Sequence, residues 1–78
     1  MSNRVMLEEA IDSAWRDYNH LHAYEASTGY DDAMDGFERK EAEGYAMGLQ
    51  NAYFIVYGEN YETKTPHFDE DNYSEWLD

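Results

Sequence analysis

The sequence has no cysteine, a single proline and few basic residues among its 78 positions. Without thiols the chain can form no disulfide framework, no thiolate metal site and no cysteine nucleophile, so its stability must come from packing. No segment is long and apolar enough to span a bilayer, and carboxylates follow the N-terminus before any apolar signal region can form. These absences predict a complete cytoplasmic protein that does not associate with membranes.

Motifs that bind phosphates or present a nucleophile are also missing. The chain contains no G-x-x-x-x-G-K-[ST], no G-x-G-x-x-G and no G-x-S-x-G. His20 and His22 lie two residues apart, which in a helix points them to different faces, so we expect surface histidines rather than a zinc pair. The acidic stretches 31–42 and 69–74 fail as calcium loops because side chains without carboxylates occupy ligand positions. We therefore expect no enzyme activity, no cofactor and no bound metal.

Acidic residues dominate the composition. Eighteen Asp and Glu face five Lys and Arg, for a net charge of −13. A chain this acidic repels nucleic acid and anionic membranes, so its natural partners are basic protein surfaces. Residues 59–78 alone hold seven acidic residues against Lys64, a net charge of −6. Aliphatic residues are scarce, but eight Tyr, two Trp and three Phe supply enough apolar area for a small core.

Apolar residues recur at helical spacing in two long segments, of which the first is residues 4–27. One face of that helix would hold Leu7, Ile11, Ala14, Tyr18 and Leu21. Ser2 or Asn3 is placed to cap this helix, and Gly29 is placed to end it. No proline or glycine interrupts the segment, so the pattern predicts one continuous helix.

The second segment ends at Gly58, a typical C-terminal stop. Its helical repeat consists of Ala42, Tyr45, Leu49, Ala52, Tyr53 and Val56. Asp35 and Glu38 predict a capping box at its start, with Asp31 or Asp32 as a start one turn earlier. Two helices joined by a short polar turn predict an antiparallel helical hairpin.

Gly44 and Gly48 lie four residues apart inside the second helix. Each glycine costs roughly 1 kcal/mol of helix propensity relative to alanine, so we predict that they allow close packing against the first helix. Residues 53–57 are apolar round the whole helix circumference, which requires a cover from the C-terminal segment or from a second copy of the chain. The candidates for self-association are therefore Tyr53, Phe54 and Tyr57.

The C-terminal twenty residues differ in character from the helices. Pro66 favours an extended conformation before it, so residues 61–68 should form an irregular or briefly strand-like connection. Tyr73, Trp76 and Leu77 are spaced for one short helical turn docking back onto the hairpin, with a frayed acidic tail as the alternative. The predicted fold is all-α, with two long antiparallel helices plus a short C-terminal helix or an irregular acidic tail, in a single domain over residues 1–78.

Carboxylates recur at three-residue steps along the start of the second helix, at Asp32, Asp35, Glu38 and Glu41. Such steps separate charges by roughly 4.5 to 6 Å along the axis, close to the spacing of about 3.4 Å between phosphates of one DNA strand. A rigid row of this kind can enter a basic groove built for nucleic acid. The predicted partner-binding residues are Asp31, Asp32, Asp35, Glu38, Glu41, Asp69, Glu70 and Asp71.

In its size, strong acidity, lack of cysteine and high tyrosine content, the chain resembles the small acidic phage-encoded inhibitors that mimic DNA to block restriction or CRISPR systems. The resemblance rests on composition and shares no specific motif. It implies competitive occupation of a basic groove in a host nuclease or in a CRISPR or restriction component, within the host cytoplasm. The alternative is a helical interaction or structural protein that acts through a hydrophobic homodimer or partner interface.

Overall fold

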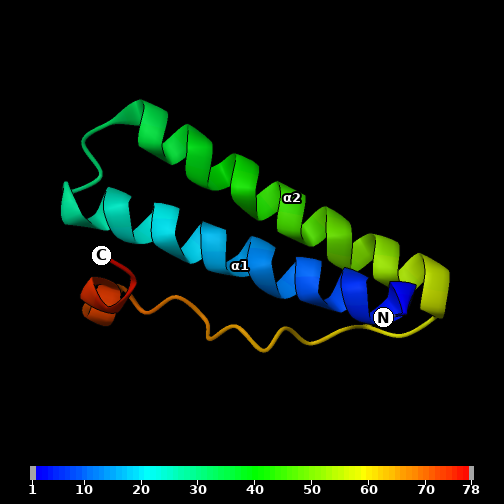
Figure 1. Cartoon of the computed structure of the whole chain (residues 1–78). Coiled ribbons are helices and arrows are strands. Elements are labelled where there is room, and N and C mark those ends of the chain that lie inside the picture. The colour runs from blue at the N-terminus through cyan, green and yellow to red at the C-terminus, as the bar shows by residue number, and fades with distance from the viewer. Residues whose placement is uncertain (1, 78) are drawn as a thin grey trace.

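A computed structural model describes residues 2–77 and contains two long helices and one short helix. They are α1 (Asn3–Ser27), α2 (Ala33–Tyr57) and the 3-10 helix η1 (Glu70–Trp76). Figure 1 shows α1 and α2 side by side and antiparallel, with the rest of the chain returning along α1 to η1. The predicted all-α hairpin with a short C-terminal helix is confirmed.

The helix ends follow from local sequence. The Ser2 hydroxyl accepts a 3.2 Å hydrogen bond from the third residue of α1, and the Asp32 carboxylate caps α2 at 2.9 Å. The second helix therefore starts at the earlier of the two predicted positions. It ends at Gly58, whose left-handed φ of 70° suits a residue without a Cβ. Between the helices, Gly29 and Tyr30 both adopt positive φ angles, and these tighten the turn.

The core between the helices is narrow and is built from small side chains. Ile11, Ala14 and Ala23 of α1 are buried against Ala46 and Tyr53 of α2. Alanines bring the two helix backbones close together, and the large Tyr53 ring fills the space at the open end of the hairpin. With so little aliphatic area buried, hydrogen bonds from the C-terminal segment supply part of the remaining stability.

Gly44 and Gly48 do not face α1, contrary to the prediction. A Cβ added at either glycine meets no atom within 4 Å outside its own neighbourhood. Each lies two residues from the buried Ala46 and so about 200° round the helix from it, on the outer side. The small residues buried between the helices are therefore alanines such as Ala14, Ala23 and Ala46, and neither glycine is among them.

Residues 59–69 form an extended strap that runs back along α1 (Figure 1). Asp12 anchors it, because Thr63 Oγ1 at 2.7 Å and the Lys64 N–H at 2.9 Å both donate to Asp12 Oδ1. The Tyr61 hydroxyl donates to Asp12 Oδ2 at 2.9 Å, and the Thr65 hydroxyl donates to the Asp12 backbone carbonyl at 2.7 Å. One residue of α1, through its carboxylate and its carbonyl, thus holds residues 61–65 of the strap against α1.

Further along α1, polar and aromatic contacts hold the end of the strap and η1. Asn19 is 2% exposed and donates a 2.8 Å hydrogen bond to a strap carbonyl. A His20 ring nitrogen lies 2.6 Å from the Trp76 carbonyl oxygen, and the two rings meet edge to face. His22 stacks on Phe68 with the ring centroids 3.9 Å apart, and partial burial lowers its pKa. His22 is therefore not the surface residue expected from sequence, and the C-terminal segment is docked rather than frayed.

Ionisation of the Tyr61 hydroxyl should weaken the attachment of the strap to α1 at alkaline pH. Burial and the hydrogen bond to Asp12 raise the pKa of Tyr61 from 10.0 to about 12. The pKa of Tyr61 is thus higher in the folded chain than in the unfolded chain. The stabilisation that its hydroxyl contributes is therefore fully present below pH 10.0 and is lost as the pH rises towards about 12. The free energy of unfolding of the native chain should therefore fall across this interval more steeply than that of Tyr61→Phe. Identical slopes in the two proteins would contradict the role given to this hydroxyl.

Candidate acidic partner-binding surface

Two of the five basic side chains are occupied in ion pairs. Arg4 pairs with Glu59 and, at 3.7 Å, with Glu8 at the open end of the hairpin. Arg39 Nε lies 3.2 Å from Glu25 Oε1, and Glu25 is 3% exposed. Most of the acidic side chains are therefore left without a basic neighbour in the part of the chain that the structure describes.

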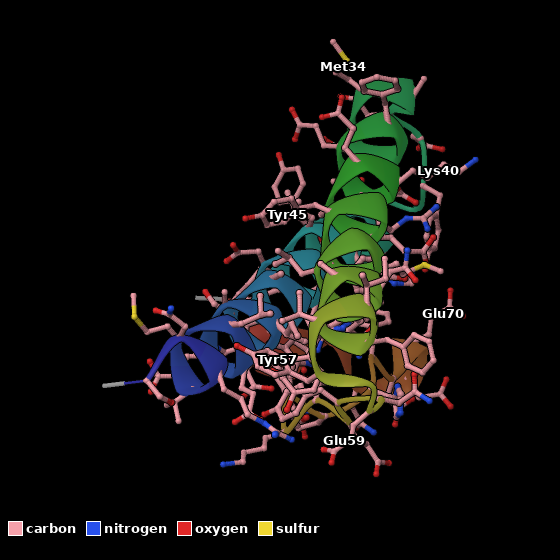
Figure 2. The ribbon with its side chains drawn as sticks, turned by 90° about the vertical axis from the view of Figure 1, so that its right-hand side faces the viewer. Met34, Lys40, Tyr45, Tyr57, Glu59 and Glu70 are labelled. Carbon is pink, nitrogen blue, oxygen red and sulfur yellow. The ribbon has the colours of Figure 1, made fainter. Side chains whose placement is uncertain are left out.

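A shallow groove of about 480 Å³ runs between α1 and α2. Its lining consists of Ala14, Asp17, Leu21, Glu38, Glu41, Ala42 and Tyr45. Three of these are carboxylates, and they are exposed, while Leu21, Ala42 and the 65% exposed Tyr45 provide apolar area between them. Asp17 lies about 140° round α1 from the strap anchor Asp12, so the strap leaves this side open. Figure 2 shows Tyr45 projecting outward from α2.

The groove brings together Glu38 and Glu41, which were predicted from sequence, with Asp17, which was not. Asp17 falls three residues after Ala14 and four before Leu21, so it shares their side of α1. That spacing indicates which residues lie beside Asp17 on one helix. Only the packing of α1 on α2 places it opposite the two glutamates.

The other predicted acids of this region lie at the turn end of α2. Asp32 is occupied as the helix cap, and Asp31 precedes it in the exposed turn. Asp35 is half-buried, and partial burial together with the carboxylates of Asp32 and Glu25 raises its pKa. The predicted stripe is therefore divided, because three-residue steps drift round the helix and turn Asp35 inward while Glu38 and Glu41 stay outside.

The predicted C-terminal acids lie in and beside η1. Asp69 caps η1 by accepting a 3.0 Å hydrogen bond from the Asp71 N–H. Glu70 accepts a 2.7 Å hydrogen bond from the Tyr30 hydroxyl, so η1 is tied to the turn between the long helices. Figure 1 places η1 at the same end of the molecule as that turn. The acids of the turn and those of η1 thus form a second acidic group, separate from the groove.

The predicted self-association residues do not share one surface. Tyr53 is 2% exposed, and its hydroxyl donates to Glu8 at 2.6 Å and accepts from Arg4 at 2.8 Å. Tyr57 is half-buried, with its ring centroid 5.1 Å from the Arg4 guanidinium carbon. Only Phe54, at 47% exposure, is open to a partner. Tyr53 is therefore corrected to a core residue, because its position on α2 faces α1.

Among residues 2–77, no group of three or more His, Asp or Glu side chains is arranged to hold a metal ion. None of the helices described contains a stretch apolar enough to cross a membrane. Comparison with protein-family models, curated proteins and solved structures finds no match to this chain. Fold and surface together define a small helical hairpin protein with a C-terminal strap and an acidic groove.

Proposed function

We propose that this protein is a non-enzymatic inhibitor that binds the basic nucleic-acid-binding groove of another protein and competes with nucleic acid for it. The observation that carries the proposal is the groove in which Asp17, Glu38 and Glu41 surround an apolar floor. These carboxylates make no ion pair with any basic side chain of residues 2–77. They are therefore free to pair with a partner.

The composition of the groove suits lysine and arginine side chains. Each has an apolar stem that packs on Leu21 and Tyr45 and a charged head that the flanking carboxylates can bind. Glu38 and Glu41 are separated by roughly 4.5 Å along α2, which is close to the spacing of phosphates. The second acidic group, at the turn and η1, adds to the negative potential that steers a basic partner towards this end of the molecule.

The test begins with a partner recovered from host lysate at low salt and then purified. The triple variant Asp17→Asn/Glu38→Gln/Glu41→Gln should bind this partner about thirtyfold more weakly, at roughly 0.7 kcal/mol for each lost charge pair. The native protein should displace a duplex oligonucleotide from the partner, and its affinity should fall steeply as salt rises.

A matched control separates the groove from the total charge. Glu9→Gln/Glu62→Gln/Glu75→Gln removes the same number of charges from exposed residues outside the groove. This control should lose only a few-fold in affinity through weaker long-range attraction. Equal losses in the two triple variants, or a partner that binds without displacing nucleic acid, would refute the proposal.

A further inference from the structure

The second half of α2 differs from the rest of the molecule in charge. Residues 44–58 contain no acidic, basic or histidine side chain, although the whole chain holds 18 acids and five bases. Much of this stretch is exposed, and its large exposed apolar side chains are Met47, Phe54, Ile55 and Val56, with Tyr45 at the border to the acidic groove. We call the exposed side of residues 44–56 the neutral face.

Most of the neutral face is left uncovered by the other residues of 2–77. η1 packs on α1, and the strap reaches this stretch of α2 where Gln50 donates a 3.1 Å hydrogen bond to the Tyr61 carbonyl. Ile55 and Val56 remain 73% and 66% exposed. An apolar patch of this extent on a strongly charged protein indicates an interaction site.

Charge decides which occupant fits this face. A basic partner would be drawn to the acidic groove and would find no counter-charge on residues 44–58. A second copy of the chain also carries a net charge of −13, so two copies repel wherever their carboxylates approach within about 10 Å. The neutral face allows contact without placing carboxylates directly opposite one another.

We infer that two copies of this protein pair through the neutral faces of their α2 helices. Gly44 and Gly48 lie on this face with open space around them, which lets a second helix approach the backbone closely. The face is about 20 Å long and lies on a single helix of each chain, so the contact is small. The dimer is therefore expected to be weak, with a dissociation constant in the micromolar range.

Sedimentation equilibrium of the full chain over a range of concentrations and salt tests the inference. The native protein should pass from monomer to dimer as concentration rises. Added salt should strengthen the association, because it screens the repulsion between two chains of charge −13. This salt dependence is opposite in sign to that expected for a basic partner at the groove, so the two interactions can be distinguished.

Two variants test the face directly, and one serves as a control. Ile55→Glu and Gly48→Leu should each weaken dimerisation by more than about tenfold, the first by adding charge and the second by holding the helices apart. Both positions are open to solvent, so the monomer should keep its helical circular dichroism. Met34→Glu makes a comparable change at a 64% exposed site outside the neutral face and should leave dimerisation unchanged.

A chain that stays monomeric up to about 1 mM would overturn the inference. It would also be overturned if salt weakened the dimer, or if Met34→Glu disrupted it as strongly as Ile55→Glu. The groove variant Asp17→Asn/Glu38→Gln/Glu41→Gln should still dimerise. A failure of the proposed groove binding and a failure of the proposed dimer can therefore be told apart.

Discussion

Replacing Arg39 with methionine should lower the free energy of unfolding by about 3 kcal/mol. Glu25 is 3% exposed, and Arg39 provides its ion pair at 3.2 Å, with only 21% of the arginine side chain exposed. The second carboxylate oxygen of Glu25 is buried and has no hydrogen-bond partner within the described part of the chain. Removing the guanidinium therefore leaves a buried charge without compensation. Urea unfolding followed by circular dichroism at neutral pH measures the change.

A double substitution distinguishes the effect of an unpaired buried charge from the effect of lost packing. Glu25→Leu/Arg39→Met removes both charges and should recover most of the stability, because a buried pair replaced by apolar groups is often neutral. Arg16→Met, at an exposed residue of α1, should change the free energy of unfolding by less than about 0.5 kcal/mol. If the double variant were as unstable as Arg39→Met, the loss would have to be assigned to packing instead.

Replacing Asp12 with alanine should cost about 3 kcal/mol and release the strap from α1. Three hydrogen bonds to this carboxylate are lost together, from Tyr61, Thr63 and the Lys64 N–H. Amide hydrogen exchange should show loss of protection along the strap, while most of α1 and α2 stays protected. Limited proteolysis should then cut within residues 59–69 faster than in the native protein.

Asp17→Ala is the control, since it removes the same side chain from the same helix on the side that the strap does not cover. Its effect on stability should stay within about 0.5 kcal/mol.

Burial acts to raise the pKa of Asp12, but hydrogen bonds from Lys64, Thr63 and Tyr61 outweigh it and hold the pKa below its usual value of 3.8. The stabilisation is therefore present above pH 3.8 and is lost as pH falls through the lowered pKa. An equal loss in Asp12→Ala and Asp17→Ala would contradict the anchoring role.

The strap also determines which acidic residues remain available to a partner. Glu8 and Asp12 lie four residues apart and would be an exposed acidic pair on an isolated helix. In the folded chain Glu8 accepts from Tyr53 and Asp12 accepts from the strap, so both are occupied. Carboxylates on the opposite side of α1, such as Asp17, are the ones left for binding.

Local sequence by itself determined the helices and their ends. Caps, stops and helical periodicity act over four residues or fewer, so the stop at Gly58 could be assigned without knowledge of the fold. The starts were predicted to within about a turn, and the structure selects Ser2 over Asn3 and Asp32 over Asp31 and Asp35. The extended segment before Pro66 is equally local. The hairpin followed from two helices joined by a short turn, and the aromatic spacing near Trp76 indicated the short final helix.

Only the tertiary structure decided what each face of these helices contacts. The rotation of α2 against α1 buries Ala46 and turns Gly44 and Gly48 outward, and helical spacing alone did not distinguish these faces. Bonds from Asp12 to the strap join residues 49 to 53 positions apart, a separation that leaves no pattern in the sequence. Asp17 lies across the groove from Glu38 and Glu41. Sequence could not show this, because a groove between two helices depends on their relative rotation as well as on the composition of each.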